Sequence, residues 1–232
     1  MHRFYSEEIP TNYAFLDHEE SRHLAKVLRL TNGDKVELID GNGKLYQCVI
    51  LEAHSKKAQL KIESEIETKS LPFNVEIAAA PTKNMNRWEW FLEKATEIGI
   101  DAIHPIFCEN SERKTLKEER QLRILKSAIK QSQKLKLPQL SSAVSFKDFV
   151  KKEFDGEKYI AHCHELPKMK LAKIHTSGKK ALILIGPEGD FSEKEIELAR
   201  SNGFVPISIS QSRLRTETAA LVACHTIHLI NA

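Results

Sequence analysis

The chain has 232 residues, of which 41% are hydrophobic, enough for one or two domains with a sizeable core. No apolar run approaches the roughly 20 residues that cross a bilayer, and the first ten residues contain no apolar signal core. We therefore expect a cytoplasmic protein with no membrane partner. The four cysteines form no CxxC pair, which argues against a zinc ribbon and predicts reduced, mostly buried thiols.

The net charge is only +3, but the basic residues are unevenly distributed. Residues 113–136 contain nine lysines and arginines against Glu118 and Glu119. A stretch of this kind can bind nucleic acid. It can also be the solvated face of a helix, and from charge alone we favour that interpretation.

Residues 1 to about 70 have the pattern of a small β domain. Two short apolar runs flank residues 40–43, Asp-Gly-Asn-Gly, which predicts a hairpin, and residues 58–67 alternate like a further strand. Apolar side chains at helical spacing predict one helix within residues 17–30. These elements fit a small barrel with one helix. The segment TKSLPF (68–73) is a plausible hinge after it.

Strands alternate with helices in the rest of the chain. This alternation predicts an α/β domain with a mostly parallel sheet and helices on both faces. Ligands of such sheets bind beyond the carboxyl ends of the strands. The predicted strands are 74–81, 102–107, 158–163, 180–186 and 205–210, and the predicted helices are 86–100, 117–135 with Pro138 as its stop, the segment after Ser192, and 217–230.

An acidic turn, residues 186–190, follows the predicted strand 180–186. Ser192 and Glu195 form a capping box at the next helix, so the turn is held in place. It matches neither GxxxxGK[ST] nor GxGxxG, and Glu188 and Asp190 would repel a polyphosphate. The turn therefore argues against nucleotide triphosphates and conventional dinucleotides, and it tolerates a neutral or cationic ligand. An ordinary strand–turn–helix corner is the alternative.

A second polar segment, SRLRTETAA (212–220), follows the last predicted strand. Thr216 and Thr218 are candidate N-caps, and Glu217 suits the first turn of a helix. A helix start with flanking arginines is the plainer interpretation. Since both polar segments follow strands of one sheet, they can also form one pocket.

Five segments, in order over nearly the whole chain, resemble one family. They are MHRFY, HLAKVLRLTNGD, WEWFLEKATEIGI, IGPEGDFSEKE and RLRTETAA.

Together these segments resemble the RsmE-type ribosomal RNA uridine-N3 methyltransferases of the SPOUT superfamily. The resemblance implies a PUA-like RNA-binding barrel in residues 1–70 and a trefoil-knotted SPOUT methyltransferase domain in residues 71–232. It also implies a homodimer, S-adenosyl-L-methionine as cofactor, and 16S rRNA of the small ribosomal subunit as partner.

The resemblance further implies two walls of a cofactor site that bind largely through backbone groups. The family usually has glycine where Ser210 stands. The residues of the first wall are Ile185, Gly186, Glu188 and Gly189, and those of the second are Ile209, Ser210, Leu214 and Arg215.

The expected reaction must remove a proton from N3 of a uracil and align that nitrogen with the methyl carbon. Arg215 is the candidate for stabilising charge on a uracil oxygen. Glu217 is the candidate for orienting Arg215 or for acting as the base. The alternative is that both residues only cap and brace the final helix.

The N3 edge of uracil is its pairing edge, so the target base must be unpaired or extruded. Basic residues would then hold the RNA through its phosphates, although a plain surface role is open for each. The candidates are Arg3, Arg22, His23, Lys26, Arg29, Lys83, Arg87, Arg113 and Lys114.

Other chemistries have weaker support. His162 and His164 share a strand face but lack further ligands, so we expect no metal. Trp88 and Trp90 are candidates for the core or for stacking on RNA bases, and we favour the core. Two rival functions stay open: a SPOUT methyltransferase with another RNA target, and a non-catalytic RNA-binding module.

Overall fold

The structure is a computed structural model that describes residues 1–9, 12–67 and 71–232. Half of the predicted hinge at 68–73, residues 68–70, lies outside the described residues. The chain divides into two compact units. The first unit is residues 1–70 with 126–137, and the second is residues 71–125 with 138–232.

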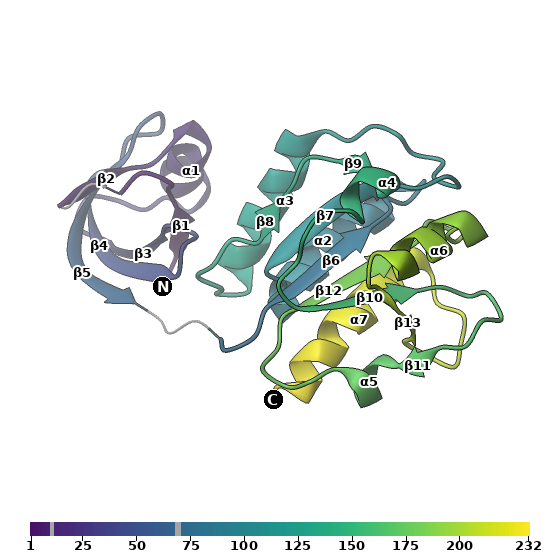
Figure 1. Cartoon of the computed structure of the whole chain (residues 1–232). Helices are drawn as coiled ribbons and strands as arrows, with labels where there is room; N and C mark the ends of the chain where they lie inside the picture. Colours follow the sequence, from purple (N-terminus) through teal and green to yellow (C-terminus); the bar gives the residue numbers. More distant parts are fainter. Residues whose placement is uncertain (10–11, 68–70) are drawn as a thin grey trace. The chain divides into compact units, whose positions relative to one another are not determined.

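The first unit is a five-stranded sheet in the order β1-β3-β4-β5-β2, which curls around one short helix (Figure 1). The predicted hairpin at residues 40–43 is confirmed, because β3 and β4 pair antiparallel on either side of it. Phe4, Leu24 and Leu38 are fully buried in its core. The elements are β1 (Arg3–Tyr5), β2 (Tyr13–Phe15), α1 (His18–Arg22), a π-helical turn η1 (His23–Val27), β3 (Lys35–Ile39), β4 (Lys44–Glu52) and β5 (Gln59–Glu67).

The second unit contains a parallel sheet in the order β11-β13-β10-β12-β6-β7-β8, with β9 pairing β7. Every strand pair in it is parallel, as the βα alternation predicts. Its strands are β6 (Val75–Ala79), β7 (Ala102–Phe107), β8 (Gln139–Leu140), β9 (Val144–Ser145), β10 (Glu157–Ala161), β11 (Met169–Lys170), β12 (Ala181–Ile185) and β13 (Val205–Ser208).

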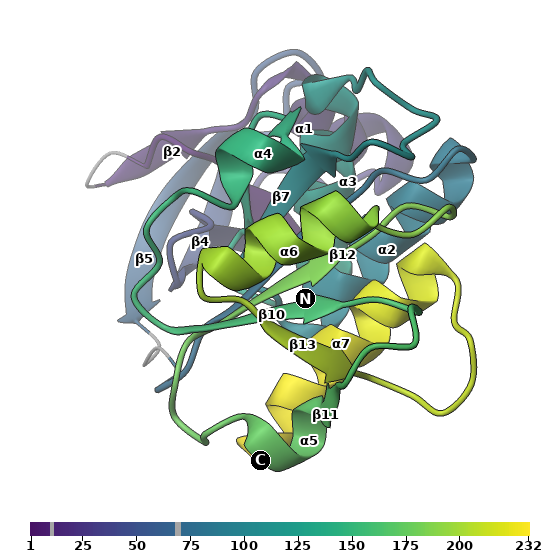
Figure 2. The ribbon, with the colours of Figure 1, turned by 45° about the vertical axis from the view of Figure 1, so that its right-hand side comes forward.

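Helices cover both faces of this sheet. Figure 2 shows α6 in front of β12, with α2 and α7 behind the sheet. All five residues of β12, the sequence ALILI, are buried, because helices lie on both sides of it. The helices are α2 (Met85–Ile98), α3 (Glu118–Gln131), α4 (Phe146–Phe149), α5 (Leu171–Ile174), α6 (Glu193–Ser201) and α7 (Thr216–Ile230).

Three sequence predictions need correction. Helix α3 ends at Gln131, well before Pro138. The cause is Gln133, whose left-handed backbone conformation, with φ 59°, cannot be part of a right-handed helix. Helix α7 has Arg215 as its N-cap without a side-chain cap, so neither Thr216 nor Thr218 caps it. Trp88 is buried and donates to Gln121 at 3.0 Å, but Trp90 is 41% exposed and lies outside the core.

The capping box at the start of α6 is confirmed in both directions. The Ser192 hydroxyl accepts from the Glu195 amide at 3.3 Å, and the Glu195 carboxylate accepts from the Ser192 amide at 2.9 Å. Ile196 and Ala199 of this helix are buried against β12 and β6. The turn before α6 is therefore fixed from its helical side.

Replacing Ser192 by alanine removes one acceptor of the capping box. We expect the free energy of unfolding of the second unit to fall by about 1 kcal/mol, as for other N-cap serines. Urea unfolding followed by circular dichroism measures the change. Lys194→Ala, at an exposed position of the same first turn, is the control and should shift stability by less than about 0.5 kcal/mol. Equal effects of the two substitutions would contradict the prediction.

Candidate active site at the carboxyl edge of the parallel sheet

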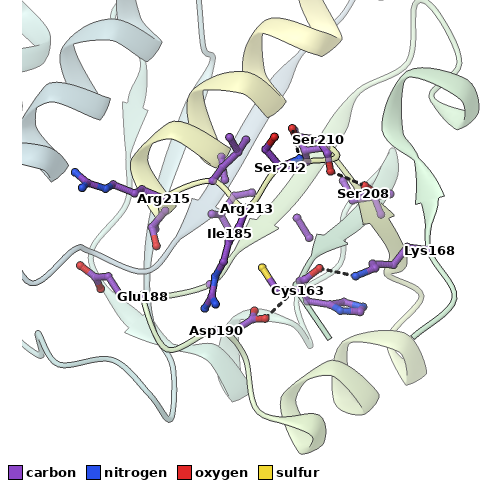
Figure 3. Close-up of a pocket in the computed structure, with 18 of the residues that line it drawn as sticks. Cys163, Lys168, Ile185, Glu188, Asp190, Ser208, Ser210, Ser212, Arg213 and Arg215 are labelled. Carbon is purple, nitrogen blue, oxygen red and sulfur yellow. Dashed lines mark hydrogen bonds between the residues drawn. The ribbon is translucent and has the colours of Figure 1, made fainter. Parts of the chain in front are cut away.

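A cavity of about 630 Å³ lies in the second unit, beyond the carboxyl ends of β10, β12 and β13 (Figure 3). Its size suits one small organic ligand. The acidic turn forms one side, and the segment between β13 and α7 forms another. Seven of the eight predicted cofactor residues line it: Ile185, Gly186, Glu188, Ile209, Ser210, Leu214 and Arg215.

The carboxylates of the acidic turn are bound to backbone amides of neighbouring loops. Glu188 Oε1 accepts from the amide of Lys83 at 3.0 Å, in the loop after β6. Asp190 Oδ2 accepts from the amide of Cys163 at 2.7 Å, in the loop after β10. Asp190 also takes a left-handed conformation with φ 63°, which short polar side chains tolerate best after glycine. Both acids therefore tie loops together.

The loop after β7 is joined to the same turn. The Asn110 side-chain amide donates to the carbonyls of Gly189 at 3.2 Å and Asp190 at 3.1 Å. A Cβ at Gly189 would lie 3.1 Å from Asn110 Cβ, and one at Gly186 would lie 3.1 Å from the Phe191 ring. Close packing therefore explains these two glycines. Gly189, the eighth predicted cofactor residue, faces Asn110 and is not among the lining residues.

The second wall accommodates a serine where the family usually has glycine. Ser210 does not occur among the described residues with positive φ, so its side chain causes no left-handed strain. Its hydroxyl accepts from the Ser212 amide at 3.1 Å, and its carbonyl accepts from the Ser208 hydroxyl at 3.1 Å. The serine therefore braces the loop.

Several residues that line the cavity were not among the predicted site residues, although Asp190 and Arg213 belong to the two polar segments expected to form one pocket. The loop after β10 contributes because it follows a parallel strand between β12 and β13, and that strand order is not visible in the sequence. Burial lowers the pKa of His162, and Lys168 adds to the effect, so this side chain is neutral near pH 7. The missed residues include Ala161, His162, Cys163, Lys168, Asp190 and Arg213.

The two predicted catalytic residues lie at the start of α7. Figure 3 shows the Arg215 side chain directed away from Cys163 and Asp190. The Glu217 side chain is 8% exposed, and its Oε1 lies 3.8 Å from Arg87 Nε. Glu217 Oε2 is buried and has no hydrogen-bond partner among the described residues. A carboxylate oxygen held this way has capacity for a further donor.

Three predicted RNA-binding residues of the second unit gather near these groups. Arg113 Nη2 donates to the Lys83 carbonyl at 2.9 Å, and Lys83 Nζ lies 2.7 Å from Glu112. Arg87 faces Glu217, as described above. Lys114 is exposed. The acidic turn, the start of α7 and this basic group are thus joined by Lys83 and Arg87.

The predicted RNA-binding residues of the first unit differ in exposure. Arg22, Lys26 and Arg29 are exposed, and His23 is half-buried. Arg3 is instead paired with Glu37 at 2.7 Å, and its side chain is 11% exposed.

In the basic stretch 113–136, several cations form ion pairs within their own unit. These pairs are Arg120–Glu89, Lys126–Glu7 and Lys130–Glu20.

The described residues show neither a metal-binding cluster nor a membrane-spanning helix. No group of three or more His, Cys, Asp or Glu side chains there has the arrangement of a metal site. No helix among them is both long and apolar enough to cross a bilayer. All four cysteines are free thiols, and Cys163 is exposed while Cys48, Cys108 and Cys224 are buried.

Replacing Glu188 by alanine leaves the Lys83 amide without its acceptor. We expect hydrogen exchange at residues 82–84 to rise about fivefold, from the loss of about 1 kcal/mol of local stability. Glu188→Gln keeps a carbonyl oxygen and should retain most of the protection. Glu193→Ala, an exposed glutamate on α6, is the matched control. Exchange that is equal in the Glu188→Ala and Glu193→Ala proteins would disprove the role given to Glu188.

Two family models match the chain: an RNA methyltransferase PUA domain over residues 16–63 and an RNA methyltransferase domain over residues 69–228. Ribosomal RNA small subunit methyltransferase E of Synechocystis is 32% identical, over 90% of this chain and 70% of the relative. A probable rRNA-methyltransferase from Porphyromonas gingivalis is 38% identical, with a TM-score of 0.93 over 100% of this chain and 98% of that chain.

A second solved structure is the ribosomal RNA small subunit methyltransferase E from Neisseria gonorrhoeae, bound to S-adenosyl methionine. It is 26% identical, with a TM-score of 0.90 over 100% of this chain and 98% of that chain. These matches confirm the resemblance and the α/β fold class with a small N-terminal PUA-like domain. The chain belongs to the ribosomal RNA small subunit methyltransferase E family of RNA methyltransferases.

Proposed function

We propose that this chain transfers a methyl group from S-adenosyl-L-methionine to N3 of a uridine in 16S rRNA of the small ribosomal subunit. The observation that carries the proposal is that residues of both motif segments, 185–188 with Asp190 and 207–216, line one cavity. Two family relatives with TM-scores of 0.88 and 0.90 were solved with this cofactor bound, which supports the same ligand here.

The side chains of the cavity fit this cofactor. Ile185, Ile207, Ile209 and Leu214 provide apolar surface for an adenine ring. The acidic turn disfavours a polyphosphate, whereas a sulfonium ligand carries no phosphate and bears positive charge on sulfur. When bound, S-adenosylmethionine supplies an electrophilic methyl group.

The residues at the start of α7 would act on the uracil. We propose that Arg215, whose side chain leaves the cavity, stabilises the negative charge that develops on a uracil oxygen as N3 loses its proton. Glu217 is the proposed acceptor of that proton. Arg87 lies beside its Oε1, while its Oε2 has no partner within the described residues.

The RNA and the assembly complete the proposal. Residues 1–70 would form the RNA-binding domain and residues 71–232 the knotted methyltransferase domain. Exposed cations in both units supply phosphate contacts. A homodimer is part of the proposal, and Leu229 of α7, 62% exposed, offers apolar surface for it. A cytoplasmic location is part of the same proposal, because the proposed substrate is ribosomal.

The test is methylation of small ribosomal subunits taken from a strain that lacks this protein. Purified protein and S-adenosylmethionine are added, and the RNA nucleosides are identified by mass spectrometry. We expect 3-methyluridine to appear in 16S rRNA. Another methylated nucleoside would keep the fold and overturn the substrate. RNA binding without any methyl transfer would favour a non-catalytic RNA-binding module.

Arg215→Ala tests the chemistry more closely. We expect the single-turnover rate of methyl transfer to fall about 100-fold, as when an enzyme loses a charge-stabilising donor. Cofactor affinity should stay within about threefold, because the side chain is directed out of the cavity. Arg200→Ala, on the exposed surface of α6 with Glu197 as its ion-pair partner, is the control. An unchanged rate would remove Arg215 from the chemistry.

A further inference from the structure

Five charged side chains line the cavity, and three of them are engaged in holding its walls. Lys168 Nζ donates to the carbonyls of His162 at 3.1 Å and His164 at 2.7 Å. Glu188 binds the Lys83 amide, and Asp190 binds the amides of Cys163 and Phe191. Lys168 and both acids therefore help to hold the loops. Among the described residues, the side chains of Arg213 and Arg215 form no such contact with the walls.

The two arginines differ in direction. Figure 3 shows the Arg213 side chain extending across the cavity toward the turn that carries Asp190, while Arg215 is directed away. Within the part of the chain that the structure describes, the Arg213 guanidinium forms no hydrogen bond or ion pair. Arg213 is thus the cation inside the cavity whose five N–H donors are all unused.

The planar guanidinium of Arg213 is suited to bind a planar anion. Two parallel N–H groups of arginine match the two oxygens of a carboxylate. The cofactor of the proposed function has one anionic group, the carboxylate of its methionine part. We propose that Arg213 binds this carboxylate and so makes the site specific for ligands that carry the intact amino-acid end; this inference depends on the proposed function.

Charge balance within the cavity supports this assignment. The amino-acid end of the cofactor carries an ammonium group beside the carboxylate. Asp190 accepts from two amides and has His164 Nε2 at 3.8 Å from its Oδ2, which leaves carboxylate lone pairs for a further donor, and it lines the same cavity as Arg213. Arg213 can therefore bind the carboxylate of the cofactor's amino-acid end while Asp190 accepts from its ammonium group. An RNA phosphate offers no group for Asp190 and would be repelled by it.

The experiment compares two ligands that differ by the carboxylate alone: S-adenosylmethionine and decarboxylated S-adenosylmethionine. Calorimetry measures both affinities for the wild-type protein, Arg213→Gln and the control Arg200→Gln. We expect Arg213→Gln to lower the affinity for S-adenosylmethionine about tenfold or more, the effect of losing a hydrogen bond between charged groups. Affinity for the decarboxylated ligand should change less than about twofold, and Arg200→Gln should match the wild-type protein.

Each other outcome has a definite meaning. Equal losses for both ligands, or no loss for either, overturn the role of Arg213 and leave the methyltransferase proposal standing. If the Arg213→Gln protein loses affinity for 16S rRNA but keeps its affinity for S-adenosylmethionine, Arg213 contacts the RNA, and its proposed role in cofactor binding is overturned. A wild-type protein that binds neither ligand overturns the proposed function itself. If Arg213→Gln does not fold, the wild-type protein still decides, because equal affinity for the two ligands contradicts the inference.

Discussion

Two carboxylates hold the candidate active-site edge of the sheet together by accepting hydrogen bonds from backbone amides of neighbouring loops. Glu188 reaches the loop after β6, and Asp190 reaches the loop after β10. Asn110 adds the loop after β7 through two carbonyls of the same turn. A charged acceptor makes a stronger hydrogen bond to an amide than a neutral one does. One short turn therefore sets the positions of loops that are far apart in the sequence.

This arrangement explains an acidic turn in a place where other α/β proteins bind phosphate. Backbone amides donate hydrogen bonds to the carboxylates of Glu188 and Asp190. The main effect of the two acids is therefore to fix the positions of the surrounding loops. The two arginines of the opposite wall, Arg213 and Arg215, point in different directions. The Arg213 side chain extends across the cavity and that of Arg215 is directed away from it, as expected if Arg213 meets the small ligand and Arg215 meets the RNA, the roles proposed above.

Much of this was readable from the sequence, because it depends on local patterns. The capping box of Ser192, the buried strand β12 and the parallel βα alternation follow from spacing alone. Long-range partners were not readable. Glu217 of α7 lies beside Arg87 of α2, and Asp190 accepts from the Cys163 amide, only because the fold brings these distant segments together. The end of α3 was missed because Gln133, not a glycine, takes the left-handed position.

The discontinuous first unit has a consequence for biosynthesis. Residues 126–137 belong to it, and Ile129 packs there with Tyr5 and Ile39. A ribosome adds about 5–20 residues per second, so several seconds separate residue 70 from residue 137. During that interval the nascent β domain has an uncovered apolar face, while β6, α2 and β7 have already been synthesised. The first unit is therefore completed only after β6, α2 and β7 of the second unit have emerged.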